Sequence, residues 1–305
     1  MPNNGHSWSV KEVSLLVKEF GKKPALEPIM SFARRFGKKN GLSPAAVKCK
    51  ITDMKNGDTE AEFPAVLFLD IETLPIIAYT WGTWGVDITN DKIIKDWCVL
   101  AFAAKWLDDP RIIADILIPK EVSARDDKRL CQHIWRLLDD ADVVIAQNGK
   151  RFDLPKINGR LWKHGVGPPS SYKTVDTMEA AKKTFGLTYN SLDFLGEYLG
   201  AGRKLKTEFE LWAKCDRGDK DALTRMTEYN QQDVFLLEEV YNKMRPWIPN
   251  HPRLTVYDKI AGVCPVCMDN NIKEIGLYTA AQRQYREFRC SSCASIWHNT
   301  KAEKS

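Results

Sequence analysis

Ala65-Val66-Leu67-Phe68-Leu69-Asp70-Ile71-Glu72-Thr73 is the stretch that decides the fold. Its first five residues form a continuous apolar run, which is typical of a strand buried on both faces of a sheet. Asp70 and Glu72 come at the end of this run, and side chains two residues apart leave a strand on the same face, about 6.6 Å apart. Two carboxylates therefore converge. A lone D-x-E pattern also occurs where a strand merely leaves the core, so it needs support from the rest of the chain.

Outward from this strand, short apolar runs alternate with helical periodicities. We expect strands at 97–104, 112–118 and 143–146, and helices at 126–138 and 154–164, with residues 177–248 mostly helical. Strands first and helices later predict an α/β domain with a mixed sheet flanked by helices.

A second acid follows the expected strand 143–146, in the segment Asn148-Gly149-Lys150-Arg151-Phe152-Asp153. Asp153 stands where a helix is expected to begin, with Pro155 just inside. That position suits an N-cap residue, which would satisfy a free backbone N–H group. It also suits a metal ligand, and the local pattern favours neither role.

A third element lies late in the chain, on the expected helix that contains Tyr229 and Asp233. Residues four apart share one face of a helix, about 6 Å apart along its axis. Asp233 falls on the same stripe as the apolar Leu237 and Val240. A carboxylate that points toward a core needs a partner, and a cation is the obvious one.

Taken in order, these three motifs resemble the DEDD superfamily of 3′ to 5′ exonucleases, which has a ribonuclease H-like, DnaQ-like fold. Tyr229, with Glu228 where the other branch would carry histidine, is similar to the DEDDy branch. The similarity covers about 63–252, including Glu208-Phe209-Glu210-Leu211-Trp212, and it resembles exonuclease-domain proteins that some phages encode without a polymerase.

The resemblance implies an enzyme that hydrolyses phosphodiester bonds at the 3′ end of DNA, single-stranded or at duplex ends. Two Mg²⁺ or Mn²⁺ ions would activate water and stabilise the leaving oxygen. Asp70 would bridge them, Glu72 and Asp233 would complete the first site, Asp153 would hold the second, and Tyr229 would orient the attacking water. Asn148, in the second motif, is a candidate contact to nucleic acid. Cleavage of RNA or within a strand stays open, as does a non-catalytic nucleic-acid-binding regulator with a vestigial nuclease fold.

Four cysteines near the C-terminus form two C-x-x-C pairs, Cys264/Cys267 and Cys290/Cys293, 22 residues apart. This spacing is typical of a structural Cys₄ zinc site, and the segment resembles a zinc ribbon. His298 is an alternative ligand. Arginines interleaved with aromatic residues lead into the second pair and fit either a nucleic-acid strand or a solvated strand face. They are Arg283, Arg286 and Arg289.

The N-terminal segment predicts three short helices at 9–20, 28–36 and 44–54. Its S-W-S-x-x-E-x-x-L-L and L-S-P-A-A-V-K-C-K-I patterns resemble Myb/SANT-like helix-turn-helix domains. Basic residues on the third helix could face a nucleic-acid groove, although a protein-interaction role stays open. They are Lys48, Lys50 and Lys55.

Charge and composition favour an intracellular protein whose partner is nucleic acid. The net charge of +5 is uneven: 1–58 carries +6, 59–258 carries −4 and 259–305 carries +3. We take these segments as a helix-turn-helix-like domain, the exonuclease domain and the zinc ribbon. No secretory signal or apolar run long enough for a membrane span is expected, so the prediction is a cytoplasmic protein, in the host if phage-encoded, with replication or repair proteins as possible partners.

Two pairs of residues inside the central domain are expected to be structural only. Trp81 and Trp84 are predicted to pack under the first strand, with a place in the substrate groove as the alternative. Lys204 and Lys206 are predicted to lie in a solvated loop, with phosphate contacts as the alternative.

Overall fold

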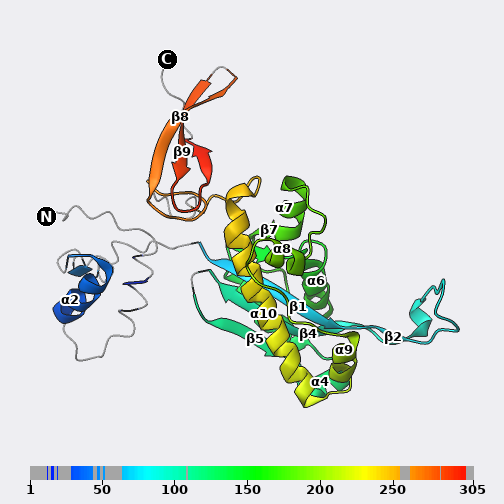
Figure 1. The fold of residues 1–305 in the computed structure, drawn as a ribbon. Helices are drawn as coiled ribbons and strands as arrows, with labels where there is room; N and C mark the ends of the chain where they lie inside the picture. Colours follow the sequence, from blue (N-terminus) through cyan, green and yellow to red (C-terminus); the bar gives the residue numbers. More distant parts are fainter. Residues whose placement is uncertain are drawn as a thin grey trace. The chain divides into compact units, whose positions relative to one another are not determined.

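A computed structural model describes residues 12, 15–16, 19, 29–43, 47–48, 51, 64–107, 109–254, 262–281 and 283–299. The chain divides into two compact units, one of Ala65–Pro252 and one that combines Met1–Pro64 with Arg253–Ser305. Figure 1 labels the helices and strands of the larger unit. The predicted domain boundaries at 58/59 and 258/259 lie outside the described residues. The division into three domains therefore stays a prediction.

A five-stranded mixed sheet forms the centre of the larger unit, in the order β5-β4-β1-β6-β7. β1 pairs with β4 antiparallel and with β6 in parallel. Farther out, β4 pairs with β5 antiparallel and β6 pairs with β7 in parallel. With helices on its faces, the sheet confirms the predicted mixed α/β fold. The strands are β1 (Val66–Leu74), β4 (Cys98–Trp106), β5 (Ile112–Ile116), β6 (Val143–Ala146) and β7 (Lys173–Asp176).

β1 is longer than its apolar run predicts. The strand continues to Leu74, because Asp70 and Glu72 keep their ladder partners on β4, with a register shift after Glu72. The expectation that both acids are carried by the strand is confirmed. They project from the strand itself, and the pairing with β4 fixes their spacing.

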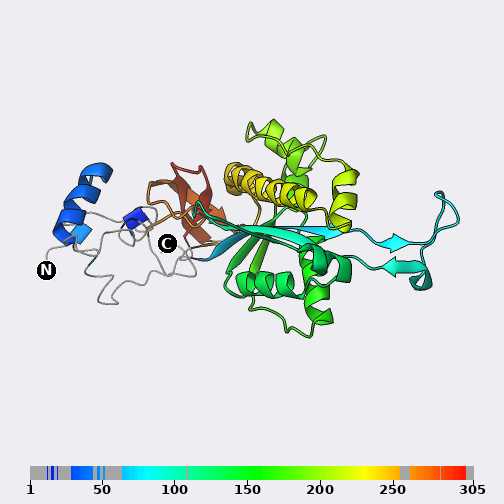
Figure 2. The same ribbon diagram turned by 90° about the horizontal axis from the view of Figure 1, so that it is seen from below.

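Helices cover both faces of the sheet, with α10 on one face and α5 on the other (Figure 2). α10 is amphipathic, and its buried stripe runs from Ala222 to Met244. The helices of this unit are α4 (Pro119–Ala124), α5 (Lys128–Asp139), α6 (Asp153–Lys163), α7 (Thr177–Thr184), α8 (Leu192–Tyr198), α9 (Phe209–Asp216) and α10 (Lys220–Met244), with 3₁₀ turns η1 (Asn90–Lys92) and η2 (Arg245–Trp247).

A buried ion pair fixes α6 to the sheet. Arg160 donates to both carboxylate oxygens of Asp127 at 2.6 Å, and the Val99 N–H donates to the same carboxylate. His164 Nε2 lies 2.6 Å from Asp127 as well. Burial alone would raise the pKa of Asp127, but the hydrogen bonds from Arg160 and His164 outweigh it and hold that pKa below its ordinary value. Asp153 begins this same helix, so its position depends on this anchor.

A projecting hairpin follows β1 directly. It contains β2 (Ile77–Ala78) and β3 (Ile93–Lys95), and Figure 1 shows it extending away from the sheet. Trp81 and Trp84 at its tip are 103% and 96% exposed. The prediction that they pack under the first strand was wrong, because the chain turns outward after Leu74 instead of folding back.

In the N-terminal segment, α2 (Ile29–Asn40) is described in full and extends beyond the expected end at residue 36. A small core contains Leu16, Ala33, Phe36, Val47 and Ile51, together with Leu42. Lys48 is exposed, whereas Lys50 and Lys55 lie outside the described residues. Most of the first and third expected helices lies outside them too, so the helix-turn-helix fold stays a prediction.

The C-terminal segment forms a three-stranded antiparallel sheet in the order β10-β9-β8. Its strands are β8 (Ile272–Ala280), β9 (Arg283–Cys290) and β10 (Ile296–His298). Throughout the described ranges of the chain, no helix has both the length and the hydrophobicity needed to cross a bilayer.

Candidate active site

Three of the predicted acids meet beside the middle of the central sheet. Asp70 and Glu72 come from β1, and Asp233 comes from α10, which packs across this strand. One carboxylate oxygen of each lies within 4.8 Å of the others. Asp233 is 1% exposed, so the cluster stands at the base of the α10 interface and not on the open surface.

Asp153 reaches β1 from the edge of the strand that faces β6. β6 pairs with β1 only as far as Phe68, so the β1 residues beyond Phe68 have no strand partner on that edge. The Ile71 N–H, between the two β1 acids, donates to Asp153 Oδ1 at 3.0 Å. Asp153 is the first residue of α6, and Phe152 holds the N-cap position without a side-chain cap bond. The N-cap interpretation of Asp153 was therefore wrong, because Asp153 is already the first helical residue and its carboxylate accepts from the Ile71 N–H of β1.

The loop before α6 brings Asp153 to this place. Asn148 adopts a left-handed φ of 60°, and its backbone N–H donates to Asp176 Oδ1, as the Lys150 N–H does to Asp176 Oδ2. A side chain at Gly149 would place its Cβ 2.3 Å from the Ala146 Cβ, so only glycine fits there. The structure gives Asn148 a backbone role in this turn, and its predicted nucleic-acid contact stays a prediction.

Two neutral side chains hold the β1 acids, and neither was singled out from the sequence as a functional residue. Asn230 Nδ2 donates to Asp70 Oδ2 at 2.6 Å, and Trp212 Nε1 donates to Glu72 Oε2 at 3.2 Å. Asn230 is the neighbour of Tyr229 in the third motif, and Trp212 ends a segment already included in the resemblance. Their motif positions were visible, but which acid each would hold depends on the packing of α9 and α10.

A lysine completes the cluster. Lys204 Nζ lies 2.6 Å from Asp233 Oδ2 and 5.0 Å from the centre of the Tyr229 ring. The expectation of a solvated loop was wrong for this residue, whose side chain is 30% exposed. Its loop turns inward because the Lys204 N–H donates to Asp193, and Arg203 also pairs with Asp193. The cluster thus contains four acids and one internal cation.

Crowding and burial favour protonated acids when no metal is bound. Burial, and then the neighbouring carboxylates, raise the pKa of Asp70 well above its ordinary value. Burial raises the pKa of Glu72 and that of Asp153 to about 7, and it also raises the pKa of Asp233, against the opposing charge of Lys204. Four acids held this close need positive charge in order to ionise together.

The donors fit a hard divalent cation. All are carboxylate oxygens, the ligands that Mg²⁺ and Mn²⁺ prefer. Asp233 is buried, and Lys204 Nζ meets its Oδ2 at 2.6 Å, so this acid already has one cationic partner. One lysine balances one carboxylate, and further buried carboxylates are costly unless other cations meet them. The site therefore suits metal binding better than a purely structural role.

An open pocket of about 460 Å³ lies beside Tyr229. Its wall carries two bases, Lys206 and Arg225, and two acids, Asp221 and Glu228, so positive groups lie beside Tyr229 without making the pocket basic overall. Tyr229 itself is 7% exposed and packs its ring edge against Trp212, 5.9 Å between centres. Basic groups beside buried acids can hold a phosphate while the acids hold cations.

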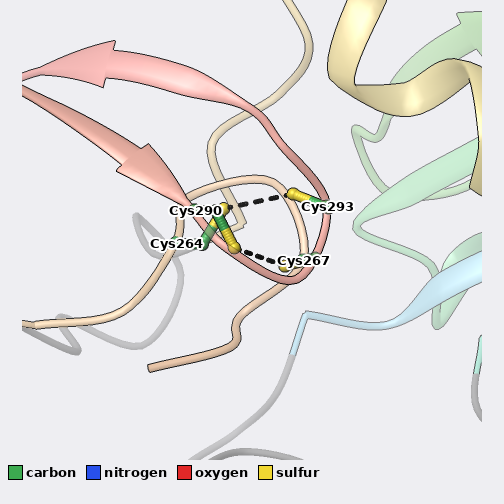
Figure 3. A group of neighbouring side chains, drawn as sticks. All are labelled: Cys264, Cys267, Cys290 and Cys293. Atoms are coloured by element: carbon green, nitrogen blue, oxygen red, sulfur yellow. Dashed lines mark hydrogen bonds between the residues drawn. The ribbon is translucent and has the colours of Figure 1, made fainter. Parts of the chain in front are cut away.

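The four C-terminal cysteines form a second cluster, shown in Figure 3. The sulfur atoms of Cys264 and Cys293 are 3.7 Å apart, and those of Cys267 and Cys290 are 3.6 Å apart. All four sulfur atoms lie within 4.8 Å of one another, as one tetrahedral ion requires. His298 stacks on Tyr278 at 4.7 Å between ring centres instead of joining the cluster.

The three arginines of β9 do not form one surface. Side chains of a strand alternate between faces, so Arg283 and Arg289 share one face and Arg286 takes the other. Arg286 pairs with Glu274 across the hairpin at 3.5 Å. The predicted interleaved surface is therefore reduced to Arg283 and Arg289 beside Tyr285, because a spacing of three residues reverses the face.

Comparisons with known proteins agree with this architecture. Residues 67–245 match the family model described as the RNase_H superfamily. Among solved structures, the chain is similar to the family B DNA polymerase from the hyperthermophilic archaeon Pyrobaculum calidifontis, with 21% identity and a TM-score of 0.45. That match covers 60% of this chain and 25% of the polymerase chain. No curated protein matches the sequence.

Proposed function

Because the chain belongs to the RNase_H superfamily, a superfamily of nucleases, we propose that it is a metal-dependent 3′ to 5′ exonuclease of the DEDDy type acting on DNA. The single observation that carries this proposal is the meeting of Asp70, Glu72 and Asp233 within 4.8 Å, with Asp153 bound to the backbone between the two β1 acids. The 3′ polarity and the choice of DNA are what the resemblance of the three motifs to the DEDDy exonucleases implies.

Asp70, Glu72, Asp153 and Asp233 would hold two divalent cations. When bound, such ions lower the pKa of water and neutralise the charge that develops on the phosphate. Asn230 keeps Asp70 in orientation, and Trp212 does the same for Glu72. Held in this way, the acids need little rearrangement when substrate arrives.

Tyr229 is assigned a positioning role for the attacking water. Burial, and then the charge of Asp233, raise the pKa of its phenol to about 12. A phenol with this pKa stays protonated near neutral pH, so it donates or accepts a hydrogen bond but is a poor proton acceptor. Lys204, beside both Tyr229 and Asp233, keeps positive charge at the same point.

The terminal segments are proposed to support this activity. The cysteine cluster would bind one structural Zn²⁺, because four thiolates fill its coordination sphere and leave no open position. Arg283 and Arg289, together with the basic N-terminal segment, would contact the phosphates of the nucleic acid. Both assignments rest on chemistry and charge within each segment.

The test uses the full chain and a 5′-labelled oligonucleotide, as single-stranded DNA, duplex DNA and RNA, with Mg²⁺, Mn²⁺ or a chelator. We expect a ladder that shortens from the 3′ end of DNA only when metal is present. The Asp70→Asn variant should lose at least about a thousandfold in rate, because metal-ion catalysis supplies several kcal/mol. Asp140→Asn, an exposed acid at the end of α5, is the matched control and should keep full activity.

Each other result points to a different function. Digestion of RNA alone would change the proposed substrate, and internal fragments instead of a ladder would change the proposed polarity. Either result would leave the assignment of the metal centre in place. Binding without any digestion would favour the non-catalytic regulator. Unchanged digestion by Asp70→Asn would refute the assignment of the acids.

A further inference from the structure

The hairpin that follows β1 carries aromatic side chains with no role in the core. Residues 75–97 form this aromatic arm, with the short strands β2 and β3 at its base. Tyr79 is 75% exposed, and Trp81 and Trp84 are almost completely exposed. Indole rings are among the largest apolar side chains, so leaving two of them in water is unfavourable unless something covers them.

The tip of the aromatic arm has the composition of a stacking surface. Residues 79–86 contain three aromatic side chains and no charged one. Gly82 and Gly85 follow the two tryptophans, and a Cβ at either glycine would meet no atom within 4 Å. Gly85 also has a φ of 62°, which allows a tight turn. The almost complete exposure of Trp81 and Trp84 leaves their indole rings accessible to a flat partner.

The aromatic arm is continuous with the proposed catalytic strand. Trp81 follows Glu72 by nine residues, which reach at most about 30 Å when fully extended. Stacked nucleotides are spaced about 3.4 Å along a strand, so this reach corresponds to at most about nine nucleotides. When the 3′ end of a nucleic acid lies at the acids, nucleotides of the same nucleic-acid strand, or of the strand paired with it, could thus reach the aromatic arm.

We propose that the aromatic arm binds unpaired bases of the nucleic-acid substrate by stacking them on Trp81 and Trp84. This inference rests on the proposed function, since it takes the 3′ end to lie at Asp70 and Glu72. Bases are flat and uncharged, and each offers a ring face to an aromatic side chain whatever its sequence. An uncharged tip suits bases better than phosphates, which the basic groups near Tyr229 would contact instead.

Equilibrium binding in a chelator tests the proposal without cleavage. The ligands are a fluorescent fifteen-nucleotide thymidine strand and a strand of equal length in which the bases are replaced by abasic sites. Trp81→Ala/Trp84→Ala should weaken binding of the thymidine strand at least about tenfold, because each base–aromatic stack typically contributes about that factor or more. Binding of the abasic strand should not change. Trp81→Phe/Trp84→Phe should restore most of the affinity.

The matched control is Trp162→Ala, which removes another exposed tryptophan, 87% exposed, at the far end of α6 from Asp153. It should bind both strands like the unaltered protein, and all variants should melt at the same temperature. An equal loss on the abasic strand, or no loss in the arm variant, overturns the proposal. The latter result would leave a protein as the partner of the arm. A wild-type protein that neither binds nor digests any nucleic acid refutes the proposed function itself, which separates the two failures.

Discussion

The carboxylate cluster and the cysteine cluster are both candidate metal centres, but they are held together in opposite ways. The carboxylates come from β1, α6 and α10, and the surrounding core includes large buried side chains such as Phe102 and Leu100. The cysteines come from one turn, from the last residue of β9 and from the turn after it. The buried cluster there consists of Cys264, Cys267 and Cys290, with a few partly buried neighbours that include Cys293. The hydrophobic core therefore positions the carboxylates, whereas a metal bound by the cysteines would stabilise the small C-terminal core.

The electrostatic contrast follows from the donors. Carboxylates repel one another in a buried site, so the metal-free cluster is destabilising and is balanced in part by Lys204. Thiols can stay neutral until a metal deprotonates them, so their cluster loses its support without a metal but stores little repulsion. Variants of either cluster therefore test this contrast.

The largest effect is expected at the cysteines. Cys290→Ser should abolish zinc binding and unfold the sheet β8–β10, because structural zinc typically contributes about 10–16 kcal/mol to such modules. Zinc content per chain and hydrogen exchange at the β8–β9 amides measure it. Ser292→Ala, an exposed position between the paired cysteines, is the control and should change neither. Retained protection of β8–β9 in the metal-free variant would contradict the comparison.

A smaller loss is expected when the carboxylate cluster loses its internal cation. Lys204→Met should lower the free energy of unfolding by about 1–3 kcal/mol in chelator, less than the ~3–5 kcal/mol of a fully buried pair, because Lys204 is partly exposed. Mg²⁺ or Mn²⁺ should reduce this difference by replacing the lost charge. Denaturation in urea with and without metal measures both.

The control for Lys204 is Lys214→Met, which removes an exposed lysine paired with Glu210 on α9. Exposed pairs of this kind contribute about 0–1 kcal/mol, so little change is expected. A loss in Lys204→Met that is equal with and without metal would show that Lys204 acts through packing and not as a counter-charge.

The smallest expected effect is an increase in stability when one acid of the carboxylate cluster is neutralised. Burial raises the pKa of Glu72 from 4.5 to about 7. Between these values the metal-free folded protein binds more protons than the unfolded chain, so its stability should fall as pH rises through this window. Asp70→Asn removes one repelling charge and should raise the stability at pH 7 by about 1 kcal/mol, or a few degrees in Tm.

Thermal melting in chelator between pH 5 and 8 measures this gain, with Asp140→Asn as the exposed control. We expect a flatter pH dependence in Asp70→Asn than in the unaltered protein. A destabilised Asp70→Asn variant would mean that the Asn230–Asp70 hydrogen bond outweighs the repulsion.

Several parts of the fold were predictable because their signals are local. The apolar run before Asp70 indicated a central strand, and Val143–Ala146 is a strand with the expected bounds. β7 was not expected, since Lys173-Thr174-Val175-Asp176 has no apolar run and becomes a strand only through parallel pairing with β6. The outward turn of the chain after Leu74, which exposes Trp81, likewise had no local signal, because the sequence of an apolar residue is the same whether its side chain packs or projects.

The sequence by itself determined the chemistry of the two clusters: which residues are acids or thiols, how they are spaced along each element, and in which order the motifs follow. It did so because period and spacing fix the face that a side chain takes on its own strand or helix. Only the tertiary structure decided which side chains meet across elements. Asp153 binding the Ile71 N–H, Lys204 against Asp233, and Asn230 on Asp70 depend on where β6 ends and how α10 crosses β1. Such contacts join residues far apart in the chain, and local periodicity carries no information about them.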